Sequence, residues 1–230
     1  MKRYEAHHLF QLREIAIGLT FIGGFIDAYT FVSRGRVLAA GQTGNIVFLS
    51  VDIAQRNLPS AFTKLMTMIF FIIGIFIVGY FRNLNHRSHY WRLPFLVAEF
   101  TACLVIGFLP KSVPNLYITP PLALVMAMQT VSFSKIEGNS YNNVFSTGNL
   151  KKSINSFSDY LFGSDHDVAS LKTALIYIEL VFGFAGGAII SALLQLVLGA
   201  KTIWIAAVFI IVVGGYYAFM LYQRDQVWDY

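Results

Sequence analysis

The sequence predicts an all-α transmembrane protein with six membrane-spanning helices, two short broken helices and two structurally related halves. Three observations lead to this fold class. Hydrophobic residues make up 56% of the 230 residues, whereas charged residues make up only 13%, about half of the share usual in soluble domains. The apolar residues form long blocks. The same order of blocks also occurs twice along the chain.

Six apolar blocks are predicted to span the bilayer, because about 20 helical residues cross its hydrocarbon core. These blocks cover residues 15–33, 61–81, 95–109, 118–133, 171–198 and 203–221. No low-complexity linker divides them. Residues 1–230 are therefore predicted to form a single integral membrane domain, with one repeat half at about 12–110 and the other at about 117–222.

Two shorter segments start with the same three residues, Thr-Gly-Asn, at positions 43–45 and 147–149. Lipid offers no hydrogen bonds, so non-helical backbone at membrane depth survives only within protein or against a water-filled cavity. Each segment is therefore predicted to be a break followed by a half-helix with a positive amino end. Gly41 and Gly44 would supply tight or left-handed backbone, and Thr43 or Asn45 would cap the helix.

Basic residues indicate that neither short segment crosses the membrane. In that arrangement 11 of the 17 basic residues lie on the side of the N-terminus and 6 on the other, as the positive-inside rule requires. Each half then has three spans, which gives an inverted repeat of the kind found in secondary transporters. Both termini are expected to be cytoplasmic. The alternative is that each segment crosses as a broken span, which gives four spans per half and a parallel repeat.

Acidic residues within the spans are expensive in lipid and need a reason to be there. Asp27 and Glu179 are the predicted proton-relay residues. The structural alternative is that Asp27 accepts bonds from the broken backbone at 41–45 or pairs with Arg34 or Arg36, and that Glu179 pairs with a neighbouring hydroxyl group.

A solute site is predicted where the two breaks meet the spans, because paired half-helix ends hold polar solutes in transporters. The predicted substrate-binding residues are Asp27, Gln42, Thr43, Gly44, Asn45, Gln129, Thr147, Gly148 and Asn149. The alternative is plain packing, with the two segments as short capped helices and Gln129 as a hydrogen-bonding link between spans.

Several functional classes find no support in the sequence. The net charge is +5, but the basic residues lie in short gaps between apolar blocks, so no nucleic-acid partner is expected. His86 and His89 have no thiolate or carboxylate beside them and are interpreted as interfacial anchors rather than metal ligands. No catalytic motif, metal site or cofactor site is found, and the protein is not expected to be an enzyme.

Two pairs of motifs resemble those of the YoaK-like family of bacterial multi-pass membrane proteins, a domain of unknown function. "GFIDAYTFV" followed by "GQTGNIVFLSVDIAQ" resembles the first pair, and "ALVMAMQTVSF" followed by "VFSTGNLKKSINSF" resembles the second. The resemblance covers residues 15 to about 221. It implies a multi-pass protein of the bacterial inner membrane and assigns no activity.

Together these features predict a small-solute transporter or facilitator of the cell (inner) membrane, working around the paired breaks. The alternative is a non-transporting membrane scaffold or regulatory subunit. The expected partners are the lipid bilayer and an unidentified small solute, and a homo-oligomer is a further open alternative.

Overall fold

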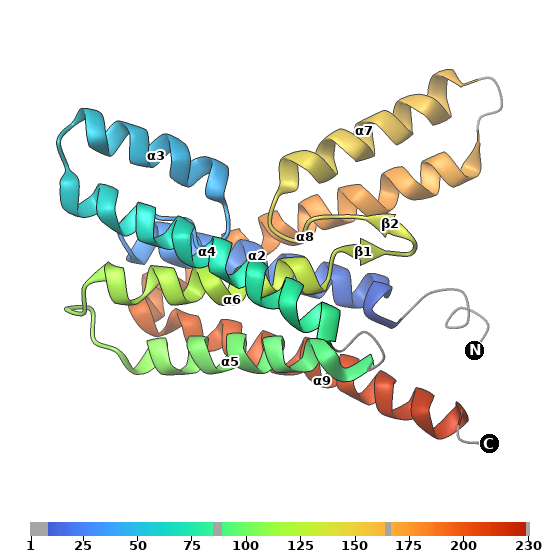
Figure 1. Ribbon diagram of the computed structural model, residues 1–230. Coiled ribbons are helices and arrows are strands. Elements are labelled where there is room, and N and C mark those ends of the chain that lie inside the picture. The colour runs from blue at the N-terminus through green and yellow to red at the C-terminus, as the bar shows by residue number, and fades with distance from the viewer. Residues whose placement is uncertain (1–8, 85–88, 164–166, 229–230) are drawn as a thin grey trace.

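A computed structural model describes residues 9–84, 89–163 and 167–228, and nearly all of this chain is helical (Figure 1). The prediction of an all-α fold is confirmed. The helices are α2 (Arg13–Ser33), α3 (Gln42–Ala54), α4 (Leu58–Leu84), α5 (Leu93–Phe108), α6 (Thr119–Ser132), α7 (Ser146–Phe162), α8 (Val168–Leu198) and α9 (Ile203–Trp228). A hairpin of two short strands, β1 (Lys135–Ile136) and β2 (Asn139–Ser140), follows α6. His86 lies outside the described residues.

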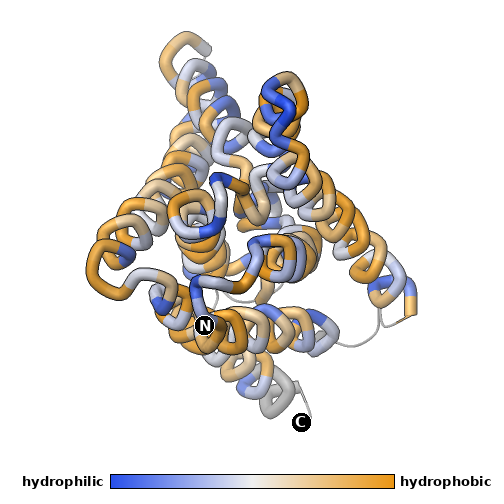
Figure 2. The backbone as a smooth tube through the Cα atoms, turned by 90° about the vertical axis from the view of Figure 1, so that its left-hand side faces the viewer, coloured by the Kyte–Doolittle hydropathy of each residue, from blue (hydrophilic) through white to orange (hydrophobic). Residues whose placement is uncertain are grey.

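Hydrophobic residues, orange along the backbone in Figure 2, occur in the outer helices as well as in the interior, and many of them are exposed. Phe76 in α4 is 74% exposed, and Leu196 and Val197 in α8 are each 83% exposed. Apolar surface on this scale needs lipid around it. By length and composition, residues 13–33, 58–84, 90–108 and 168–223 can cross a membrane, and the last stretch contains both α8 and α9.

The six predicted spans each correspond to a helix, but α6 is too short to cross a bilayer unaided. It has 14 residues, or about 21 Å of helix against a hydrocarbon core of about 30 Å. Most of α6 is buried by other helices. The number of six spans therefore stays a prediction.

Helix α2 runs parallel to α8 and touches it along its whole length. Arg13 near the start of α2 pairs with Glu179, and Ser33 at its end pairs with Gln195. In the middle the two backbones meet at glycine, because a Cβ added to Gly187 would lie 2.0 Å from the carbonyl oxygen of Phe21. Close helix packing in membranes commonly relies on such small residues.

Helices α4 and α6 form an equivalent parallel pair. The hydroxyl groups of Thr67 and Thr119 lie 3.0 Å apart. A Cβ added to Gly74 would lie 2.4 Å from the carbonyl oxygen of Leu124.

The remaining helix contacts also occur in equivalent pairs. Helix α3 packs on α4 as α7 packs on α8, α5 packs on α6 as α9 packs on α2, and α5 and α9 pack on each other. Exchanging α2–α5 with α6–α9 thus maps each of these helix contacts onto another one, except the contact of α5 with α9, which maps onto itself.

The chain between α2 and α4 leaves the bundle and returns at the same end. Arg34, just after α2, and Asn57, just before α4, line one pocket. Between these points the chain runs back along α2, since the amide of Ala40 donates to the Oδ1 atom of Asp27 at 2.7 Å. Helix α3 then leads outward again (Figure 1).

The chain between α6 and α8 follows the same kind of path at the opposite end. Glu137, in the turn of the β hairpin, pairs at 3.0 Å with Lys172 near the start of α8. Between them, the carbonyl oxygen of Asn143 comes so close to Gly23 in α2 that an added Cβ would lie 2.6 Å away. Helix α7 then leads outward (Figure 1).

We expect Gly187→Ala to destabilise the protein by about 1–3 kcal/mol, because the new methyl group overlaps the backbone of α2. Gly186→Ala is the matched control, since nothing lies within 4 Å of its added Cβ and alanine favours the helix. The free energy of unfolding in mixed micelles, measured by titration with SDS, distinguishes them. Equal effects of the two substitutions would contradict the described contact of α2 with α8.

Candidate functional site

One face of α2 carries a stripe of small and polar residues that contacts both breaks. Thr20, Gly23, Asp27, Thr30 and Arg34 follow one another at spacings of three or four residues, which places them along one side of a helix. All but Gly23 are polar, and those four are at least 96% buried. The stripe is the frame of the candidate site.

Asp27 holds the first break against α2. Its Oδ1 atom accepts the amide of Ala40 at 2.7 Å, and one turn further on the hydroxyl group of Thr30 accepts the amide of Ala39 at 3.2 Å. A Cβ added to Gly41 would lie 3.1 Å from the Oδ2 atom of Asp27. Asp27 therefore places a carboxylate at the amino end of α3, where the helix dipole favours a negative charge.

Asp27 is expected either to accept bonds from the backbone or to pair with an arginine. In the structure it accepts the backbone amide of Ala40 and does not pair with Arg34. The Nε atom of Arg34 donates instead to the hydroxyl group of Tyr29 at 3.0 Å. Of the tight or left-handed backbone expected at Gly41, the structure has the tight turn: its φ is −73°, and the amide of Gln42 donates to the carbonyl oxygen of Ala40 at 2.8 Å. Gly35 and Arg36 have the positive φ values in this loop, 83° and 56°.

Asn45 clamps the chain that precedes α3 and does not cap the helix, so the expected cap is wrong. Its Oδ1 atom accepts the amide of Leu38 at 2.9 Å, and its Nδ2 atom donates to the carbonyl oxygen of Leu38 at 2.6 Å. The same Nδ2 atom donates to Gln42 at 3.0 Å, and Gln42 donates to the carbonyl oxygen of Ala39 at 3.0 Å. The amide of Asn45 thus supplies both bonds that the Leu38 backbone needs.

Asn149 makes the same clamp in the other half. Its side chain bonds the amide and the carbonyl oxygen of Asn142, seven residues earlier, at 3.3 and 2.6 Å. Leu38 likewise lies seven residues before Asn45. The asparagine of the repeated Thr-Gly-Asn sequence therefore makes the same pair of hydrogen bonds in both halves.

The threonines and glycines of the two motifs make less contact. Thr43, Thr147 and Gly148 are exposed, and Gly44 is half-buried. A Cβ added to Gly44 would lie 2.7 Å from the side chain of Leu38, whereas one added to Gly148 would meet nothing within 4 Å. A close approach explains Gly44. Nothing in the structure explains Gly148.

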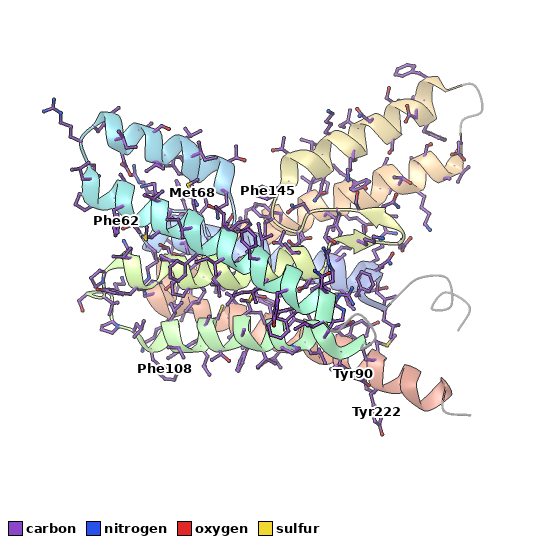
Figure 3. The ribbon with its side chains drawn as sticks, in the orientation of Figure 1. Phe62, Met68, Tyr90, Phe108, Phe145 and Tyr222 are labelled. Carbon is purple, nitrogen blue, oxygen red and sulfur yellow. The ribbon has the colours of Figure 1, made fainter. Side chains whose placement is uncertain are left out.

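The two breaks contact α2 one turn apart. Asn143 lies against Gly23 and Ala40 is bonded to Asp27, which is a separation of about 6 Å along the helix axis. Gly23 is the middle residue of α2. Phe145, the residue just before α7, lies near the centre of the molecule between the inner ends of α3 and α7 (Figure 3).

Several buried polar atoms near the second break have no hydrogen-bond partner among the described residues. They are both side-chain polar atoms of Asn143, the hydroxyl group of Ser146 and the Oε1 atom of Gln129. The Nε2 atom of Gln129 donates to the carbonyl oxygen of Leu19 in α2 at 3.3 Å. Buried polar atoms left unpaired in a structure are uncommon and mark a place for a polar ligand or water.

The other two acidic residues within the spans differ from Asp27. Glu179 forms an ion pair with Arg13, in which its Oε2 atom accepts from the Nε atom at 2.5 Å, and its side chain is 42% exposed. Both carboxyl oxygens of Glu99 in α5 are buried and lack a partner among the described residues.

Sequence reasoning missed Asn142, Asn143 and Ser146. Asn142 turns the chain into α7, since its Oδ1 atom accepts the amides of Val144 and Phe145, each at 3.0 Å. A signal was available in the pair of asparagines placed just before the second motif. Because the clamp acts on backbone, its partner in the first half is a leucine, and no comparison of side chains would have revealed the match.

The profile of a family described as a protein of unknown function, DUF1275, matches residues 15–216. The chain belongs to this family. A relative in Bacillus subtilis (strain 168), described as the UPF0700 transmembrane protein YoaK, is 27% identical over 199 residues, which cover 84% of this chain and 88% of the relative. No solved structure matches the chain. The resemblance to YoaK-like membrane proteins is confirmed, and neither description assigns an activity.

We expect Asn45→Ala to lower the free energy of unfolding by about 2–4 kcal/mol, because the amide and carbonyl groups of Leu38 both lose their partner. Asn149→Ala should have a similar cost. Asn155→Ala is the control, since this asparagine is exposed on α7. Titration with SDS in mixed micelles gives the values. A loss of less than about 0.5 kcal/mol in both clamp variants would contradict the structural role of the clamps.

Proposed function

We propose that this membrane protein carries a small polar solute across the bilayer, with the solute bound between the two breaks. The single observation that supports the proposal most is the meeting of two helix breaks on one face of α2, one turn apart, with unpartnered polar atoms beside them. Solute sites of many secondary transporters lie where broken helices meet near the middle of the membrane.

The proposed topology is an inverted repeat with six spans and two re-entrant half-helices. Corresponding helices of the two halves run in opposite directions, as α2 and α6 do (Figure 1). The exchange of helix contacts between the halves supports the same relation. Transport would proceed by one half rocking against the other. The proposed location is the cell (inner) membrane with both termini in the cytoplasm, following the distribution of basic residues.

In this proposal the polar groups at the breaks have separate tasks. The solute would contact Asp27, Gln129, Asn143 and Ser146. Asp27 is buried at the first break, and the other three have buried polar atoms without a partner among the described residues. The clamp side chains Asn45 and Asn149, together with Gln42, would position these groups. Thr43, Gly44, Thr147 and Gly148 would border the path of the solute.

A non-transporting scaffold is the second candidate. The contacts of Asp27 and Asn45 favour it, since both side chains are engaged by backbone in the same protein. The two candidates differ in one physical property. A transporter needs water to reach the breaks, whereas a scaffold needs only their packing.

Cysteine accessibility tests this difference. In a Cys103→Ala background, Thr43→Cys and Thr147→Cys should react with a membrane-impermeant maleimide in intact membranes. Val47→Cys on the apolar face of α3 should not react, because its side chain is 56% exposed and is expected to face lipid. No reaction at 43 and 147 would contradict a water-accessible site and favour the scaffold.

Solute profiling of membrane vesicles with and without the protein tests transport itself. Asp27→Asn should keep the bond to Ala40, because an amide oxygen also accepts, and should remove the charge from the site. We expect it to lower transport of the identified solute at least tenfold. Asp159→Asn, on the exposed surface of α7, should have no effect. Unchanged transport by the Asp27 variant would remove Asp27 from the site.

A further inference from the structure

A pocket of about 520 Å³ lies at the end of the bundle where α2 ends and α4 begins. It is distinct from the breaks and has a size that suits a small molecule. Phe62, which lines it, is at the left end of the molecule in Figure 3. The polar residues that line it are Arg34, Asn57, Ser60, Thr63 and Asn115.

Arg34 brings a buried positive charge to this pocket. Its side chain is 1% exposed, and arginine is a cationic side chain. One nitrogen, Nε, donates to the hydroxyl group of Tyr29 at 3.0 Å. The Nη2 atom is buried and has no hydrogen-bond partner within the described part of the chain. The ion pairs found in that part are made by Arg13, Lys64 and Lys172 and not by Arg34. A buried charge without a counter-ion is costly.

The amino end of α4 adds to the positive potential of the pocket. The first intrahelical acceptor of α4 is the carbonyl oxygen of Asn57, bonded to the amide of Ala61, so the amides before Ala61 have no acceptor within the helix. With 27 residues, α4 is long enough to carry a full helix dipole. The carboxylate of Asp52 pairs with Lys64 at 2.5 Å.

We propose that this pocket binds the oxyanion group, phosphate or carboxylate, of a small molecule or a lipid head group, with Arg34 as its charged ligand. The planar guanidinium group matches two oxygens of such a group with two parallel hydrogen bonds. Asn115 brings an amide donor to the same pocket, whereas the hydroxyl groups of Thr63 and Ser60 are bonded to the carbonyl oxygen of Pro59 and to Lys64. The proposal does not depend on transport, so failure of one leaves the other standing.

Thermal denaturation of the purified full-length protein in detergent tests the binding of free anions. Sodium phosphate and sodium succinate are titrated against sodium chloride of equal ionic strength. We expect both oxyanions to raise the melting temperature in a saturable way. Arg34→Gln should weaken the apparent affinity by about 10- to 100-fold, because a hydrogen bond to a charged group contributes a binding free energy of that size.

Arg36→Gln is the matched control, because Arg36 is exposed two residues away and should leave the affinity unchanged. If Arg34→Gln does not fold, Arg34→Lys keeps the charge without the planar fork and should bind phosphate more weakly than the wild type. Equal affinities of the wild type and the Arg34 variant would overturn the proposal.

A second arm distinguishes a lipid head group from a free anion. The protein is placed in nanodiscs of phosphatidylcholine, with or without phosphatidylglycerol, and the melting temperature is measured again without added anion. Stabilisation by phosphatidylglycerol that is lost in Arg34→Gln and kept in Arg36→Gln supports a lipid source. No Arg34-dependent stabilisation in either arm overturns the site.

Discussion

Lipid cannot form hydrogen bonds with the backbone, and the two breaks exist only because the protein supplies those bonds itself. In each half one asparagine supplies them, since the amide groups of Asn45 and Asn149 each bind both polar atoms of a residue seven positions earlier. This bond pattern fixes the place at which α3 and α7 begin. The close packing of α2 on α8 at Gly187 then holds the face against which both breaks lie.

The two halves share the clamp but differ in which group accepts the backbone amides just before the half-helix. In the first half the acceptor comes from another helix, as Asp27 in α2. In the second half it is local, as Asn142 accepts the amides of Val144 and Phe145. The first break therefore has a carboxylate as its acceptor, whereas the second has an amide and keeps the side-chain atoms of Asn143, which have no partner among the described residues. The two breaks thus share the clamp but differ in their polar groups.

The fold class and the position of the breaks could be predicted from the sequence, because both follow from patterns that a single chain displays. Long apolar blocks dictate helices in lipid, and the repeated Thr-Gly-Asn residues mark interruptions. The role of Asn45 could not be predicted, because its partner is backbone and the loop geometry that presents Leu38 is set by Gly35 and Arg36 at positive φ. The β hairpin could not be predicted either, because strands of two residues show no alternating pattern in the sequence.

The placement of Arg34 depends on the same loop. Asp27 and Arg34 lie on one face of α2, about 10 Å apart along the axis, and their opposite charges make a direct ion pair an obvious expectation. The returning chain prevents it, because the amide of Ala40 bonds to Asp27 while Arg34 turns to Tyr29. A direct pair would leave the amide of Ala40, just before α3, without its acceptor. Lipid offers no hydrogen bond to replace it. The hydrogen bonds of the backbone therefore keep the two charged groups apart. The carboxylate of Asp27 lies at the first break, and Arg34 lies at the pocket.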